Sequence, residues 1–128
     1  MEFIDLKKQQ KKIRSKIDFS IGKVLDHGKY ILGPEVQDLE EKLAKFIGAK
    51  YCITVSSGTD ALLISMMALN IGNGDEVITT PFTFAGTIEA IVLLGAKPVY
   101  VDICANTYNI DPNKIENAIS NKTKLILP

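Results

Sequence analysis

The first 48 residues carry apolar positions at the three- and four-residue spacing of amphipathic helices. From Lys7 to Asp26 the spacing predicts one helix with charged outer faces. It should end at His27-Gly28, because glycine readily adopts the left-handed conformation that terminates helices. A connector, 29–33, follows, and Pro34 is predicted to open a second helix that Gly48 closes. The stripe expected to be buried on this helix is Val36, Leu39, Leu43, Phe46 and Ile47.

After Gly48 the pattern changes to short apolar runs that alternate with helical segments. We predict strands at 51–55, 76–80, 98–102 and 123–127, and helices at 60–70, 87–94 and 112–120. Strands separated by helices of this length indicate a mostly parallel sheet covered on both faces. The fold class is therefore α/β, in three layers. Residues 1–34 are expected to form a helical arm and residues 35–128 the α/β body.

Composition excludes several classes of protein. The 128 residues are 46% hydrophobic and 23% charged, as in an ordinary globular domain, and 15 basic side chains balance 15 acidic ones. A net charge of zero argues against nucleic-acid binding as the main function. Without a leader or a long apolar run we expect a cytoplasmic protein with no membrane segment. Cys52 and Cys104 are expected to be buried thiols in strands, which predicts neither a disulfide framework nor a metal site.

Small and hydroxylated residues stand where the strand at 51–55 is predicted to lead into the next helix. Ser57, Gly58, Thr59 and Asp60 could hold a phosphate through free N–H groups of the first helical turn, helped by the helix dipole. Asp60 is expected to contribute its backbone and to turn its carboxylate away. The alternative is plain helix capping, which favours the same residue types. The spacing matches neither the Walker pattern nor the dinucleotide fingerprint.

Two aromatic residues follow the next predicted strand. Ligands collect at the carboxyl edge of an open α/β sheet, so Phe82 or Phe84 could stack on a planar ring beside a phosphate held by the preceding turn. The residues alone do not choose between the two. The alternative is that both rings belong to the core.

The order of six segments resembles the N-terminal third of the DegT/DnrJ/EryC1/StrS sugar aminotransferases, and the resemblance covers the whole chain. The segments are GKYILGP (28–34), SGTDAL (57–62), GDEVI (74–78), PFTF (81–84), GAKPVYVD (95–102) and YNIDP (108–112). The resemblance implies the first part of the large domain of aminotransferase fold type I, the cofactor pyridoxal 5'-phosphate (PLP) and a homodimer.

Carried over by position, the resemblance assigns Gly58, Thr59 and Asp60 to the cofactor phosphate and Phe84 to the cofactor ring. Gly28 and Tyr30 match positions that approach a nucleotide-sugar. No lysine here matches the family's Schiff-base lysine, which is expected beyond residue 128 together with the aspartate that pairs with the pyridinium nitrogen. The 128-residue chain alone is therefore expected to be inactive.

The function implied by the resemblance is transfer of an amino group, from glutamate, to the keto sugar of a UDP-linked hexuronate, in polysaccharide biosynthesis. Relatives that act on dTDP- or GDP-sugars leave the base and the sugar open. Two alternatives remain at this stage. One is a sugar dehydratase of the same family that uses PLP or pyridoxamine phosphate (PMP), and the other is a truncated remnant that binds a phosphate or a nucleotide-sugar without catalysis.

Overall fold

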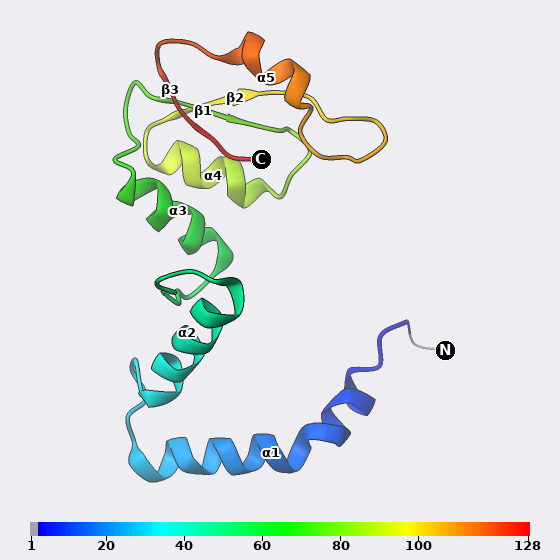
Figure 1. Cartoon of the computed structure of the whole chain (residues 1–128), viewed down its shortest axis with the longest axis vertical. Coiled ribbons are helices and arrows are strands. Elements are labelled where there is room, and N and C mark those ends of the chain that lie inside the picture. Colours follow the sequence, from blue (N-terminus) through cyan, green and yellow to red (C-terminus); the bar gives the residue numbers. More distant parts are fainter. Residues whose placement is uncertain (1–2) are drawn as a thin grey trace. The chain divides into compact units, whose positions relative to one another are not determined.

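The computed structural model of the chain describes residues 3–128, which divide into two compact units, Met1–Thr54 and Val55–Pro128 (Figure 1). The first unit consists of helices α1 (Leu6–His27) and α2 (Pro34–Ile47) and the segments around them. Asp5 caps α1 by accepting the Lys8 N–H, and Gly28 ends it with φ +66°. Both predicted helices are confirmed, to within one residue at each end.

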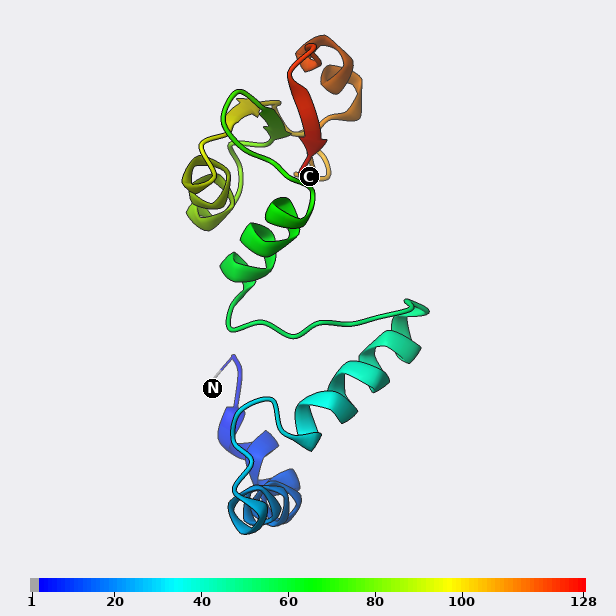
Figure 2. The same ribbon diagram turned by 90° about the vertical axis from the view of Figure 1, so that its left-hand side faces the viewer.

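The second unit is a parallel α/β layer structure. Its elements are α3 (Gly58–Ala68), β1 (Glu76–Thr79), α4 (Ala85–Leu93), β2 (Lys97–Tyr100), α5 (Pro112–Ala118) and β3 (Thr123–Ile126). The strand order is β2-β1-β3, with β1 parallel to both neighbours. Connections between parallel strands are right-handed, and the chain moves from β1 to β2 and then back past β1 to β3. The two crossover helices, α4 and α5, consequently lie on opposite faces of the sheet (Figures 1 and 2).

Among the described residues the buried apolar core lies entirely in the second unit. Met66 of α3, Val77 of β1 and Ile91 of α4 are fully buried members of this core, and Leu125 of β3 packs against it. The predicted three-layer α/β architecture is thus confirmed. No helix within residues 3–128 combines the length and the apolar character needed to cross a membrane.

Three expectations about burial and pairing are wrong. The segment 51–55 forms no strand, because no described residue pairs with it, and Ile53 is 80% exposed. The α2 stripe is not buried, since no other element of its unit covers it; Phe46 and Ile47 are exposed. The thiols of Cys52 and Cys104 are only half-buried and lie outside the named strands.

Candidate cofactor and substrate site

The N-terminus of α3 presents two N–H groups that have no acceptor among the described residues, those of Gly58 and Thr59. Ser57 precedes them in an extended conformation and caps the helix, its Oγ accepting the Asp60 N–H at 3.1 Å. The helix therefore begins two residues earlier than predicted, which places Gly58 and Thr59 inside its first turn. Free N–H groups at the positive end of a helix dipole suit an anion.

The carboxylate of Asp60 is directed to its own side of the turn, where it accepts a hydrogen bond from the Ser56 hydroxyl. This hydrogen bond, with a smaller contribution from the Ser57 side chain, lowers the pKa of Asp60 below its ordinary value. Because the Asp60 N–H already bonds to Ser57, an anion can reach that N–H only by replacing the serine hydroxyl. Gly58 and Thr59 are the donors that need no such exchange.

Both phenylalanines lie at the surface, so the alternative that assigned them to the core is wrong. Phe84 occupies the N-cap position of α4, and its side chain is 80% exposed. Phe82 is 63% exposed and contacts the Tyr108 ring, with the centroids 5.9 Å apart and the planes tilted by 34°. Phe84 thus has a free ring face, whereas Phe82 already has an aromatic neighbour.

Gly86 brings the ring of Phe84 and the hydroxyl of Thr59 together. A Cβ atom added at Gly86 would lie 3.0 Å from two ring atoms of Phe84 and 3.0 Å from Thr59 Oγ1. The turn at Gly58 and Thr59 and the ring of Phe84 therefore lie close to the same point, where α3 packs against α4. Sequence reasoning missed Gly86, because the predicted helix began at residue 87 and left this glycine outside it.

A buried hydroxyl lies at the carboxyl end of β1. Thr79 is 1% exposed, and its Oγ1 has no hydrogen-bond partner within residues 3–128. Side chains alternate along a strand, so Thr79 shares the face of Val77, which packs against α3 and α4. An unpaired buried hydroxyl costs free energy, which favours a polar neighbour at this edge of the sheet.

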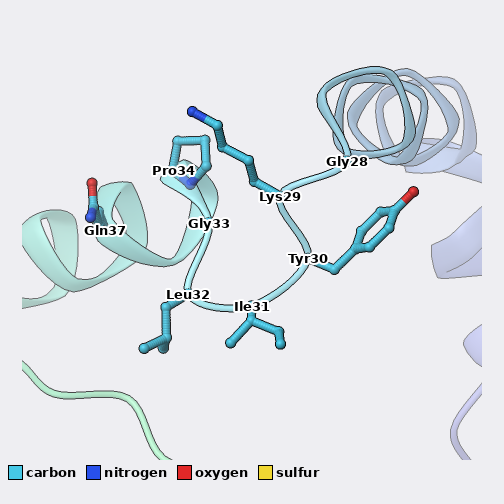
Figure 3. A pocket seen from close by; sticks show the side chains of 8 residues that line it. All are labelled: Gly28, Lys29, Tyr30, Ile31, Leu32, Gly33, Pro34 and Gln37. Atoms are coloured by element: carbon cyan, nitrogen blue, oxygen red, sulfur yellow. The ribbon is translucent and has the colours of Figure 1, made fainter.

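The first unit contains the two predicted substrate residues, Gly28 and Tyr30, in the connector between α1 and α2. Tyr30 is exposed, and its ring points outward from the connector (Figure 3). Residues 28–34 and Gln37 line a hollow of about 520 Å³. The connector turns tightly: Leu32 has φ +47°, and a Cβ atom at Gly33 would lie 2.3 Å from the Lys29 carbonyl oxygen.

The model of the DegT/DnrJ/EryC1/StrS aminotransferase family matches residues 11–128. The chain belongs to this family. The resemblance inferred from the six segments is thereby confirmed, and so is the part of fold type I expected from it.

Individual relatives agree with the family assignment. Over its whole length the chain is 61% identical to a UDP-2-acetamido-2-deoxy-3-oxo-D-glucuronate aminotransferase from Pseudomonas aeruginosa. The match covers 36% of that protein. It matches the crystal structure of a family aminotransferase from Brucella abortus with a TM-score of 0.93 and 40% identity, over 98% of this chain and 36% of that one. NtdA from Bacillus subtilis, solved with bound PMP, matches with a TM-score of 0.86 and 42% identity, over 89% of this chain and 26% of NtdA.

The chain spans between about a quarter and about a third of the length of these relatives. PLP, expected as the cofactor, is confirmed as the cofactor of the family. The residues present fit its chemistry: Gly58 and Thr59 offer unpaired N–H groups to a phosphate, and the Phe84 ring and the Thr59 hydroxyl both lie beside Gly86.

Proposed function

We propose that this chain is the N-terminal part of a PLP-dependent nucleotide-sugar aminotransferase, with residues 1–34 as an arm and 35–128 as the start of the large domain. The whole enzyme transfers an amino group from glutamate to the keto group of a UDP-linked hexuronate, in the cytoplasm, for polysaccharide biosynthesis. The observation that carries the proposal is the meeting of the Gly58–Thr59 turn with the Phe84 ring at Gly86.

Each site residue has a defined task in this proposal. The N–H groups of Gly58 and Thr59 bind the phosphate, and the Thr59 hydroxyl adds a donor beside them. Asp60 contributes its backbone N–H once the phosphate replaces the Ser57 hydroxyl. Phe84 fixes the plane of the cofactor ring through its exposed face. Bound PLP supplies the electron sink for amino transfer.

The substrate assignment rests on the first unit and on the identity of 61% to the aminotransferase from P. aeruginosa. Gly28 and Tyr30 are proposed to approach the nucleotide-sugar, and the hollow of the connector has the size of a small-molecule site. A homodimer is proposed because apolar residues of α1 and α2, including Phe19 and Phe46, remain exposed and need a covering surface.

Amino transfer by the full-length protein tests the proposal. Purified protein loaded with PLP is mixed with the 3-keto UDP-uronate and glutamate, and 2-oxoglutarate and amino sugar are measured. Formation of both in equal amounts supports the proposal, whereas loss of water from the sugar without amino transfer identifies the dehydratase. Binding of UDP-sugar with neither reaction identifies the non-catalytic alternative. We expect the Schiff-base lysine in the remainder of the enzyme, so residues 1–128 alone should form neither product.

A further inference from the structure

A single imidazole makes hydrogen bonds on both sides of the connector. His27 is the last residue of α1, and its Nδ1 accepts the Lys29 backbone N–H at 3.0 Å. A nitrogen that accepts an N–H carries no proton, so the proton of this ring is on Nε2. Nε2 lies 3.2 Å from Glu35 Oε1, in the first turn of α2, and therefore donates to it. The contact is a hydrogen bond from a neutral ring to a carboxylate.

These two hydrogen bonds close the connector at its base. Lys29 stands at its start and Glu35 just beyond its end, so His27 joins the two helix ends across residues 28–33. The Lys29 carbonyl oxygen, in turn, approaches Gly33 so closely that no Cβ atom fits there. The loop between these contacts carries Tyr30 and surrounds the hollow (Figure 3). Its shape therefore depends on the orientation of the imidazole.

The groups around the pair keep Glu35 ionised. His27 is the less exposed partner, with 27% of its side chain accessible against 46% for Glu35. The pKa of Glu35 is lowered, first by its own backbone N–H and then by the hydrogen bond from His27. Lys23, one turn earlier on α1, adds a weaker favourable charge. Glu35, at the N-terminus of α2, is thus an ionised carboxylate that accepts a hydrogen bond from the Nε2–H group of His27.

We propose that His27 is a positioning residue for the nucleotide-sugar. As a neutral ring, it holds the connector in the conformation that presents Gly28 and Tyr30, without touching the reacting atoms itself. This inference rests on the proposed function, because it assumes that the connector binds the sugar nucleotide. It predicts that the tautomer of His27 sets the affinity for the keto sugar and leaves the handling of the amino donor unchanged.

Three substitutions at one position separate the two hydrogen bonds in the full-length enzyme. His27→Asn retains an oxygen that accepts the N–H two residues later, as in an Asx-turn, but loses the donor to Glu35. His27→Gln retains an amide N–H that reaches Glu35 but loses the acceptor for Lys29. His27→Ala loses both. The loss of one hydrogen bond of this kind weakens binding by a factor of about 3 to 10. KM for the keto sugar should therefore rise by about that factor in His27→Asn and His27→Gln, and by more in His27→Ala.

Three further readouts distinguish positioning from a general loss of structure. The value of kcat and the KM for glutamate should stay within about twofold of wild type. The Lys29 amide should exchange its hydrogen faster in His27→Ala and His27→Gln than in wild type and His27→Asn. As a matched control, Arg14→Gln breaks the 2.8 Å contact with Asp18 on the same helix and should leave both KM values unchanged.

Glu35→Gln tests the neutral tautomer. The amide oxygen of glutamine still accepts a hydrogen bond from the Nε2–H group, so this variant should keep its KM for the keto sugar within about twofold of wild type. A loss as large as that of His27→Ala would instead indicate an imidazolium ion pair and overturn the assignment. Unchanged KM values in all His27 variants, or equal losses in kcat and in both KM values, would also overturn the proposal. If wild-type enzyme transfers no amino group, the proposed function fails, while Lys29 exchange still decides whether His27 closes the connector.

Discussion

Replacing Phe84 by leucine tests which aromatic residue meets the cofactor. The side chain is 80% exposed, so its loss should change the free energy of unfolding by no more than about 0.5 kcal/mol. A stacked aromatic pair contributes about 0.5–1.5 kcal/mol beyond the area it buries. Since about 1.4 kcal/mol corresponds to a factor of ten, Phe84→Leu should weaken cofactor binding about 2- to 12-fold.

The measurement is the affinity of the full-length apoenzyme for PMP. PMP has no aldehyde and so reports non-covalent contacts alone. Phe82→Leu is the matched control, because the Phe82 ring already contacts Tyr108 and lies at the same edge of the same unit. Its affinity for PMP should equal that of wild type. Unchanged affinity in Phe84→Leu, or a larger loss in Phe82→Leu, would refute the stacking assignment.

Three further predictions concern the core, an acid-sensitive contact and two glycines. Ile91 is fully buried, so Ile91→Ala should lower the free energy of unfolding by about 2–5 kcal/mol in urea titrations and Ile91→Val by about 0.5–1.5 kcal/mol; equal effects would contradict the packing. The hydrogen bond from the Ser120 hydroxyl is the main cause that lowers the pKa of Glu76, so this carboxylate stabilises the fold above its unfolded pKa and the stabilisation is lost as the pH falls through the lowered pKa. Glu76→Gln removes this titration, so its urea midpoint should fall less steeply than that of wild type below about pH 4.5. An unchanged pH profile would argue against the contact. Gly33→Ala puts a methyl group 2.3 Å from a connector carbonyl oxygen and should raise KM for the keto sugar several-fold. Gly22→Ala, which has open space around it in a helix, should raise the free energy of unfolding by about 0.5–1 kcal/mol. An unchanged KM in Gly33→Ala would contradict the connector geometry.

Local patterns predicted most of the fold because most of its elements are specified locally. Gly28 and Pro34 bracket the connector by the conformations they favour, and both helix ends lie as predicted. The alternation of strands and helices after Gly48 predicted a parallel sheet, which the structure confirms. The segment 51–55 has a strand-like composition but no strand, since a strand needs a pairing partner that its own residues do not encode. Likewise, the spacing of Leu39 and Leu43 identifies an apolar face without identifying what covers it.

The site was predictable to the same extent. The turn at Gly58 and Thr59 was noticed because small and hydroxylated residues stand together where a helix was predicted to begin, although helix capping favours the same residue types. The residues alone left Phe82 and Phe84 as equals, because their difference lies in their neighbours: Tyr108 contacts one, and Gly86 lies beside the other. Such contacts between residues far apart in sequence depend on how α3 packs against α4 and on where the loop after β2 runs.

The hydrogen bonds of His27 could not be predicted from the sequence for a related reason. His27 and Glu35 are eight residues apart, a spacing that joins no two positions of one helix or strand. They meet because Gly28 and Leu32 both adopt positive φ angles, which turn the chain sharply between α1 and α2. Glycine predicts the first of these angles, but nothing in the sequence predicts a left-handed leucine.

Transfer of ¹⁵N from labelled glutamate to a keto UDP-uronate by the full-length, PLP-loaded protein tests the central claim most directly. The account predicts ¹⁵N in the amino group of the sugar product and one equivalent of 2-oxoglutarate, both lost when PLP is removed and restored when it is added back. An amino sugar without ¹⁵N, or turnover that does not depend on PLP, would contradict it.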